Sequence, residues 1–223
     1  MTAGRFRDRT EAGRLLTAKL RAYVDRPDVL VVALPRGGVP VGFEVAKALQ
    51  VALDVMVVRK LGVPGQEELA MGAITTGGVR VLNRPIVEEL GISDSRIEAV
   101  AAEQQRELAR RERLYRGSRA APQVAGRTVI VVDDGIATGS TMRAALCALK
   151  KQEAARIIVA VPIAPRSTVR ELEAEQVEVV CVRATEPFGA IGAWYEDFAQ
   201  TSDDEVCELL EEAARDREGA HHR

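Results

Sequence analysis

The chain has 223 residues, of which 47% are hydrophobic and 29% are charged, and its formal net charge is −2. This balance is typical of a globular protein and gives no overall attraction for nucleic acid or an anionic membrane. No apolar run approaches the roughly 20 residues that span a bilayer, and the charged N-terminus lacks the apolar segment of a secretory signal. The cysteines, Cys147, Cys181 and Cys207, fit neither a disulfide framework nor a zinc site. We therefore expect a cytoplasmic protein without nucleic-acid or membrane partners.

The first part of the chain alternates helix and strand patterns. Residues 8–11 have the form of a capping box and predict a helix that runs to about Val24. Residues 29–34 are a short apolar run rich in β-branched side chains, which predicts a strand buried on both faces, as in a parallel sheet. A glycine-rich turn at 35–38 and a helix over about 40–49 follow.

The middle of the chain departs from this alternation. Residues 54–58 predict a second strand, which ends at Arg59 and Lys60. Residues 70–82 predict a hairpin around a Thr-Thr-Gly-Gly turn. A second capping box at Ser95 opens a charged helix with a thin apolar stripe that extends to about Tyr115 and includes Leu114.

We expect the region of about residues 65–116 to be a flexible insertion that closes over a bound ligand, because it offers little apolar surface to anchor it. The rival interpretation is that its charged helix docks rigidly on a second subunit, which would make the protein a homodimer.

The second half returns to alternation. It predicts strands at 128–132, 156–161 and 177–182, and helices at about 140–151, 167–175 and 202–215. Strands alternating with helices predict an α/β fold with a doubly wound parallel sheet, in which ligands bind beyond the carboxyl ends of the strands. We expect residues 1–217 to form a single domain and residues 218–223 to be a disordered tail.

The strongest chemical signal is segment 129–145, where an apolar strand leads directly into acids, glycines and hydroxyls. Asp133 and Asp134 end the strand, where carboxylates can hydrogen-bond sugar hydroxyls. The small residues from Gly135 to Gly139 let backbone N–H groups approach a ligand, and hydroxyl side chains then open the next helix. Together these features predict a sugar-phosphate site. The alternative is an ordinary strand-to-helix loop.

This segment resembles the motif that binds 5-phosphoribosyl 1-pyrophosphate (PRPP) in type I phosphoribosyltransferases: an apolar strand, two acids, a loop ending in Thr-Gly, and then Ser/Thr. The resemblance covers Val29 to Tyr195. It extends loosely to bacterial phosphoribosyltransferase-domain proteins of unsettled acceptor that open with Phe6-Arg-Asp-Arg9 and carry a helical insertion. It implies a Rossmann-like parallel sheet, a small hood from the terminal segments and a hairpin-plus-helix insertion. A Walker A loop is excluded, because the chain contains no Gly-Lys-Ser/Thr.

The resemblance also implies roles for individual residues. Asp133 and Asp134 would hold the ribose hydroxyls, while Arg36 and Lys60 would hold pyrophosphate; these four are the candidate catalytic residues. The candidate PRPP-binding residues are Arg36, Gly37, Gly38, Asp133, Asp134, Gly135, Ala137, Thr138, Gly139, Ser140 and Thr141. A Mg²⁺ ion would be held mainly by PRPP and water near the two acids, with no direct protein ligand expected. The alternatives to these binding roles are a plain turn at residues 35–38 and a solvated strand-end charge at Lys60.

The loop after the last strand falls where family members recognise the acceptor. Phe188, Trp194 and Tyr195 are the candidates there, and the alternative is a packed aromatic cluster. Hypoxanthine–guanine-type members carry an acid at the position of Ala137, so standard 6-oxopurine salvage is disfavoured. The function implied is a phosphoribosyltransferase of nucleotide metabolism that uses PRPP and Mg²⁺ with a small-molecule nitrogen acceptor, expected to be a nucleobase. The alternative is a PRPP-sensing regulatory protein without catalysis.

Overall fold

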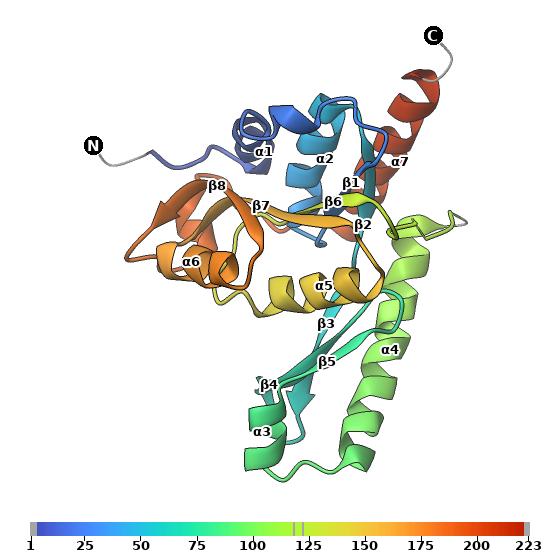
Figure 1. Ribbon diagram of the computed structural model, residues 1–223, viewed down its shortest axis with the longest axis vertical. Helices are drawn as coiled ribbons and strands as arrows, with labels where there is room; N and C mark the ends of the chain where they lie inside the picture. Colours follow the sequence, from blue (N-terminus) through green and yellow to red (C-terminus); the bar gives the residue numbers. More distant parts are fainter. Residues whose placement is uncertain (1–3, 118, 122, 221–223) are drawn as a thin grey trace.

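The computed structural model describes residues 4–117, 119–121 and 123–220. Its centre is a five-stranded parallel sheet with the strand order β2-β1-β6-β7-β8 (Figure 1). These strands are β1 (Val29–Ala33), β2 (Ala52–Val55), β6 (Thr128–Val132), β7 (Arg156–Pro165) and β8 (Glu178–Thr185). The predicted α/β fold with a parallel sheet is therefore confirmed.

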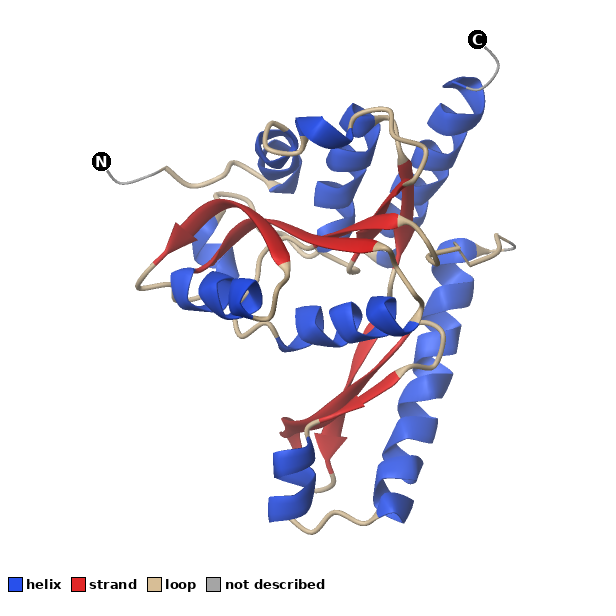
Figure 2. Cartoon of the chain, viewed as in Figure 1, coloured by secondary structure: helices blue, strands red, loops and turns tan. Residues whose placement is uncertain are grey.

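Helices cover both faces of this sheet (Figure 2). Helices α1 (Arg9–Thr17) and α2 (Gly38–Leu49) pack on one face, and α5 (Ser140–Lys151) and α6 (Arg166–Ala174) pack on the other. In β6, Ile130 and Val132 pack in the core beneath α1 and α2, while Val129 and Val131 pack in the core beneath α5 and α6. Burial on both faces explains why this strand is apolar without interruption.

The strand order reverses direction between β1 and β6. The chain passes outward from β1 to β2 on one side, and from β6 through β7 to β8 on the other. Ala33 pairs with Val132, so the loops that leave these two strands start side by side. Open parallel sheets bind ligands at such a switch point.

A second, antiparallel sheet projects from the first and contains β3 (Val58–Val63), β4 (Gln66–Thr75) and β5 (Arg80–Leu82) (Figure 1). The β4–β5 hairpin was predicted, but the single strand predicted over 54–58 is wrong. β2 ends at Val55 and β3 begins at Val58, so the apolar run passes from one sheet to the other. Lys60 accordingly lies inside β3 and not at the end of a parallel strand.

The insertion continues with α3 (Arg84–Glu89), which was not predicted, and the long helix α4 (Asp94–Arg116). The apolar stripe of α4 is buried at Ile97, Ala101 and Leu108, and it shares a core with α7 (Asp203–Ala220). Leu114 was assigned to this stripe but is 40% exposed. The predicted capping box is also wrong, since the N-cap residue is Ser93, which makes no side-chain cap.

The segment around Phe6 and the segment from Trp194 to Glu196 meet beside the sheet and form the small hood that the sequence led us to expect. Phe6 N donates to Trp194 O, and Glu196 N donates to Phe6 O, each at 2.8 Å. The segment after β8 includes a short 3₁₀ helix, η2 (Ile191–Trp194). At the other end of the chain, α7 continues to Ala220, so the tail predicted from residue 218 begins within a helix; residues 221–223 lie outside the described part.

The first predicted helix is divided. Asp8 Oδ1 accepts from Glu11 N at 2.7 Å and caps α1, as the sequence predicted. The helix ends at Thr17, however, and a 3₁₀ helix, η1 (Arg21–Tyr23), follows it. Among the described residues, none of the helices is long and apolar enough to cross a membrane.

Candidate functional site

The loop after β1 packs directly against the loop after β6. Leu34 N donates to Val132 O at 2.9 Å, and the peptide between Pro35 and Arg36 is cis. A Cβ atom on Gly37 would overlap Asp134 Oδ2, and one on Gly38 would lie 2.8 Å from Val132 O. The two glycines are therefore required by the close approach of this loop to the acids.

The adjacent acids have different surroundings. Asp133 Oδ1 accepts from Asp134 N at 2.9 Å, and Asp133 lines the cavity beside the next loop. Asp134 Oδ2 accepts from Arg9 Nε at 2.8 Å, with the two side chains 11% and 12% exposed respectively. The buried hydroxyl of Tyr195 donates to Asp134 O at 2.6 Å. One acid thus faces the cavity, while the other is held by the N-terminal segment.

Burial raises the pKa of both carboxyl groups above the ordinary range. The charge of Asp134 raises the pKa of Asp133 further, because two adjacent carboxylates repel each other. The ion pair with Arg9 acts in the opposite direction on the pKa of Asp134. This arrangement favours the charged form of Asp134 over that of Asp133 before any cation binds.

The hydroxyl-rich loop between β6 and α5 surrounds a cavity of about 170 Å³. Gly139 has a φ of 78°, a conformation suited to glycine, and no side chain caps the first turn of α5. Arg143 Nη1 donates to Thr138 O at 3.0 Å and braces the loop. The cavity is lined by Asp133, Gly135, Ile136, Ala137, Thr138, Gly139, Ser140, Thr141, Met142 and Ile191. An uncapped helix N-terminus with neighbouring hydroxyls is suited to an anion.

Arg36 extends from the first loop toward α7. Its Nη1 lies 3.9 Å from Asp203 Oδ1, and the same oxygen accepts from the Tyr115 hydroxyl at 2.6 Å. The Arg36 side chain remains 29% exposed. The last turn of α4 and the first turn of α7 therefore orient a guanidinium that is still accessible to a ligand.

Lys60 approaches from the antiparallel sheet. Its Nζ lies 3.3 Å from Glu68 Oε2 and donates to Glu68 O at 3.2 Å. Lys60 lines a cavity of about 490 Å³ together with Thr138, Ser140 and Thr141. The structure thus brings Lys60 to the hydroxyl-rich loop.

The aromatic candidates divide into two kinds. Phe188 and Trp194 are half-buried with ring centroids 6.4 Å apart, and Trp194 Nε1 donates to Phe188 O at 3.1 Å. Tyr195 is only 2% exposed, and its hydroxyl is occupied by the backbone of Asp134. Phe188 and Trp194 pack partly against a core that includes Tyr195, and neither is among the residues that line the cavity beside the acids. The Tyr195 hydroxyl holds the backbone of Asp134.

Sequence reasoning missed Arg9, which lies 125 positions from its partner Asp134. In the sequence, Arg9 belongs to a capping box and to a segment that resembles other proteins, and neither feature indicates a role at the site. No periodicity or spacing connects it with the acids, because the contact exists only once the hood has formed.

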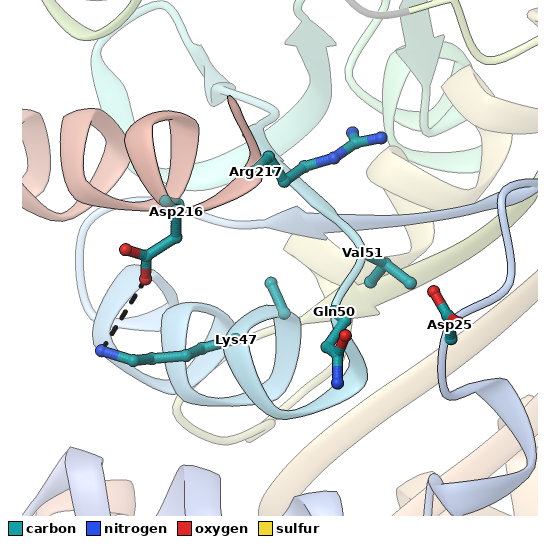
Figure 3. Close-up of a pocket in the computed structure, with 8 residues that line it drawn as sticks. Asp25, Lys47, Gln50, Val51, Asp216 and Arg217 are labelled. Carbon is teal, nitrogen blue, oxygen red and sulfur yellow. Dashed lines mark ion pairs between the residues drawn. The ribbon is translucent and has the colours of Figure 1, made fainter. Parts of the chain in front are cut away.

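A further cavity of about 580 Å³ lies between α2 and α7 and contains none of the predicted site residues (Figure 3). It is lined by Asp25, Ala46, Lys47, Gln50, Val51, Ala213, Asp216 and Arg217. Lys47 Nζ lies 3.8 Å from Asp216 Oδ2 across it.

The fold and the paired loops define a doubly wound α/β protein with its candidate site at the switch point of the sheet. A family model described as the phosphoribosyl transferase domain matches residues 8–196, and the chain belongs to this family. The predicted resemblance to type I phosphoribosyltransferases is thereby confirmed.

Individual relatives agree with this assignment. The chain is 47% identical over 211 residues to a Mycobacterium tuberculosis protein that carries the provisional name phosphoribosyl transferase Rv0571c. That alignment covers 95% of this chain but only 47% of the relative, so the chain spans about half of the relative's length. The crystal structure of TT1426 from Thermus thermophilus is 42% identical, covers 93% of this chain and 98% of its own, and has a TM-score of 0.81. AQ2163 from Aquifex aeolicus, at 13% identity and a TM-score of 0.51 over 91% of this chain and 84% of its own, shares the fold alone.

Proposed function

We propose that this protein uses PRPP and Mg²⁺ to transfer a ribose 5-phosphate group to a nitrogen acceptor, with release of pyrophosphate. The observation that carries this proposal is the meeting of three features at one switch point: the Arg36 loop, the adjacent acids and the hydroxyl-rich loop. Each matches a different part of PRPP, namely its pyrophosphate, its ribose and its 5-phosphate.

The residue roles follow from this arrangement. The loop from Ala137 to Thr141 would hold the 5-phosphate on uncapped N–H groups and hydroxyls. Asp133 and Asp134 would accept hydrogen bonds from the ribose hydroxyls. Arg36 and the N–H groups of Gly37 and Gly38 would hold pyrophosphate. Lys60 would supply a second positive charge from β3.

The donor set fits Mg²⁺ in the manner expected for phosphate-bound magnesium. Asp134 Oδ2 is bound by Arg9 and Asp133 Oδ1 by a backbone N–H, so few carboxylate oxygens are available for direct coordination. Mg²⁺ usually retains several waters and is held by one or two carboxylates plus substrate phosphates. When bound, the ion would neutralise charge on the pyrophosphate oxygens.

The reaction needs mainly orientation and charge neutralisation. The acceptor nitrogen forms a bond to C1 of the ribose as the bond from C1 to the pyrophosphate oxygen breaks, and both electrons of that bond leave with pyrophosphate. The proton that the acceptor nitrogen carried is released to water. Positive charge develops on the sugar ring and negative charge on the leaving group. In this proposal the two acids would stabilise the positive charge on the sugar ring, and Arg36 would stabilise the negative charge on pyrophosphate.

A nucleobase is the proposed acceptor, and Phe188 and Trp194 are the proposed contacts. Their half-buried, stacked rings offer an aromatic surface beside η2. Ala137 places a methyl group where hypoxanthine–guanine-type enzymes carry an acid, so we propose an acceptor other than a 6-oxopurine.

Isothermal titration calorimetry with PRPP and Mg²⁺ tests the proposal directly. We expect the wild type to bind, and Asp133→Asn/Asp134→Asn to weaken binding by about tenfold or more, because hydrogen bonds to charged groups contribute roughly 1.5–3 kcal/mol each. Glu103→Gln is the control, since Glu103 is exposed on α4. Unchanged affinity in the double variant would contradict the proposed site.

A further inference from the structure

We infer that Arg9 is a positioning residue for Asp134: it fixes one carboxylate oxygen, so that the other oxygen can accept from the ribose. This inference rests on the proposed function, and it assigns part of the PRPP site to the N-terminal segment.

The ion pair is short and enclosed. Arg9 Nε lies 2.8 Å from Asp134 Oδ2, and the two side chains are 12% and 11% exposed. Other arginine pairs of α1 and its N-terminal flank lie at the surface: in the Arg7–Asp8 and Arg14–Glu44 pairs the arginines are each 63% exposed. Water screens such exposed pairs, whereas a pair in a low-dielectric environment is strongly coupled.

Contacts from the C-terminal side of the hood fix the Arg9 guanidinium. Arg9 Nη1 donates to Ala199 O at 2.7 Å, and its Cζ lies 4.0 Å from the centre of the Phe198 ring. The Phe198 ring lies 5.0 Å from that of Tyr195, whose hydroxyl donates to Asp134 O. Arg9 therefore holds the side chain of Asp134, while Tyr195, which packs against Phe198, holds its backbone carbonyl.

The first loop is in contact with the same pair. A Cβ atom on Gly37 would overlap Asp134 Oδ2 and would lie 3.2 Å from Arg9 Nε. The pair therefore lies directly behind the loop proposed to hold pyrophosphate. Movement of Arg9 would change the acid and the loop together.

The charged and titratable groups that face Asp134 are Arg9 of α1, Asp133 of the same loop and Tyr195 of the hood. Burial raises the pKa of Asp134, and the hydrogen bond and charge of Arg9 are the largest causes that lower it, with a smaller contribution from a backbone hydrogen bond. Loss of Arg9 would raise this pKa further. Ribose binding that needs the carboxylate would then be lost at a higher pH as the solution is acidified.

The test measures PRPP–Mg²⁺ affinity by calorimetry across pH for the wild type, Arg9→Ala and Arg9→Lys. We expect Arg9→Ala to weaken binding by about tenfold or more near neutral pH and to shift the acid limb of the binding profile upward. Arg9→Lys retains the charge and should restore much of the affinity and return the acid limb toward its original position. Arg14→Ala is the matched control, since it removes an arginine ion pair of 2.9 Å from the same helix at the surface.

A double-mutant cycle with Asp134→Asn identifies the route of the effect. If Arg9 acts through Asp134, Arg9→Ala should add little further loss of affinity once the carboxylate is gone. A full additional loss in that background, or unchanged binding by Arg9→Ala, would overturn the inference while leaving the proposed function intact. Absence of PRPP binding by the wild type would overturn the proposed function, and this inference with it.

Discussion

Arg36 is the accessible cation of the loop after β1, and Asp203 lies 3.9 Å from its guanidinium. We expect Arg36→Ala to weaken pyrophosphate and PRPP by roughly tenfold or more, because each charge-assisted hydrogen bond contributes about 1.5–3 kcal/mol. Ribose 5-phosphate should be affected much less, since it lacks the pyrophosphate group. Calorimetry with the three ligands measures this difference. Equal weakening of all three would place Arg36 away from pyrophosphate.

Asp133 links binding to stability. Burial and the neighbouring charge raise its pKa in the folded protein, so at a pH above that value the ionised carboxyl destabilises the fold. As the pH falls through the raised pKa toward the ordinary value, the folded state takes up the proton first and this destabilisation is lost. Asparagine resembles the protonated form.

We therefore expect Asp133→Asn to increase the free energy of unfolding at pH 8 by on the order of 1 kcal/mol, even though it weakens PRPP binding. The gain should decrease as the solution is acidified. Denaturant titrations at several pH values measure it, with Glu103→Gln expected to stay within about 0.5 kcal/mol of the wild type. A variant less stable than the wild type at pH 8 would show that the Asp133 carboxylate stabilises the fold.

The acids and the hydroxyl-rich loop could be located from sequence because they occupy one continuous segment at the end of a clear strand. Arg9 could not, because its position depends on a hood that forms between the two ends of the described chain. Tyr195 was predicted to contact the acceptor, but it is only 2% exposed, and this burial depends on packing that local sequence does not specify.

At the scale of elements, the sequence predicted best where burial is uniform. β6 was predicted over its full range, Thr128–Val132, because both of its faces are covered by helices. A similar apolar run at 54–58 led to the wrong prediction of one strand, because β2 and β3 follow each other closely there but belong to different sheets. A continuous apolar run does not reveal where the chain leaves one sheet for another.

The mobility of the insertion stays a prediction, and the contacts of α4 indicate which end of it would stay fixed. The C-terminal end of α4 is anchored: Arg116 Nε lies 3.0 Å from Asp54 Oδ1, and its Nη2 donates to Val55 O at 2.7 Å. Helix α3 and the ends of β4 and β5 next to it lie farther from the parallel sheet (Figure 1), while Ile74 and Thr75 at the other end of β4 are buried. A lid would therefore pivot about this end of α4.

Hydrogen exchange with and without PRPP–Mg²⁺ tests the lid. We expect amides of β4 and β5 to exchange fast in the free protein and to become protected on binding, while amides near Arg116 stay protected in both states. Complete protection of β4 and β5 in the free protein would contradict closure and would favour the rigid docking of α4 on a second subunit.

For the whole molecule the family is shown, while the reaction and its acceptor are proposals. The chain spans about half of the Mycobacterium tuberculosis relatives that it matches, so partners and pathway are open to experiment. In the function that we propose, Ala137 would disfavour hypoxanthine and guanine, and the stacked Phe188 and Trp194 rings would favour a planar base.

A screen of nucleobases with PRPP and Mg²⁺ that follows pyrophosphate release measures transfer of the phosphoribosyl group directly. We expect release that depends on both PRPP and one or more bases, that is weak with hypoxanthine and guanine, and that falls by about tenfold or more in Asp133→Asn. Robust turnover of a 6-oxopurine would show that another residue replaces the acid absent at Ala137. If the protein binds PRPP but releases no pyrophosphate with any nucleobase, nucleobase transfer is contradicted and PRPP sensing becomes the better account.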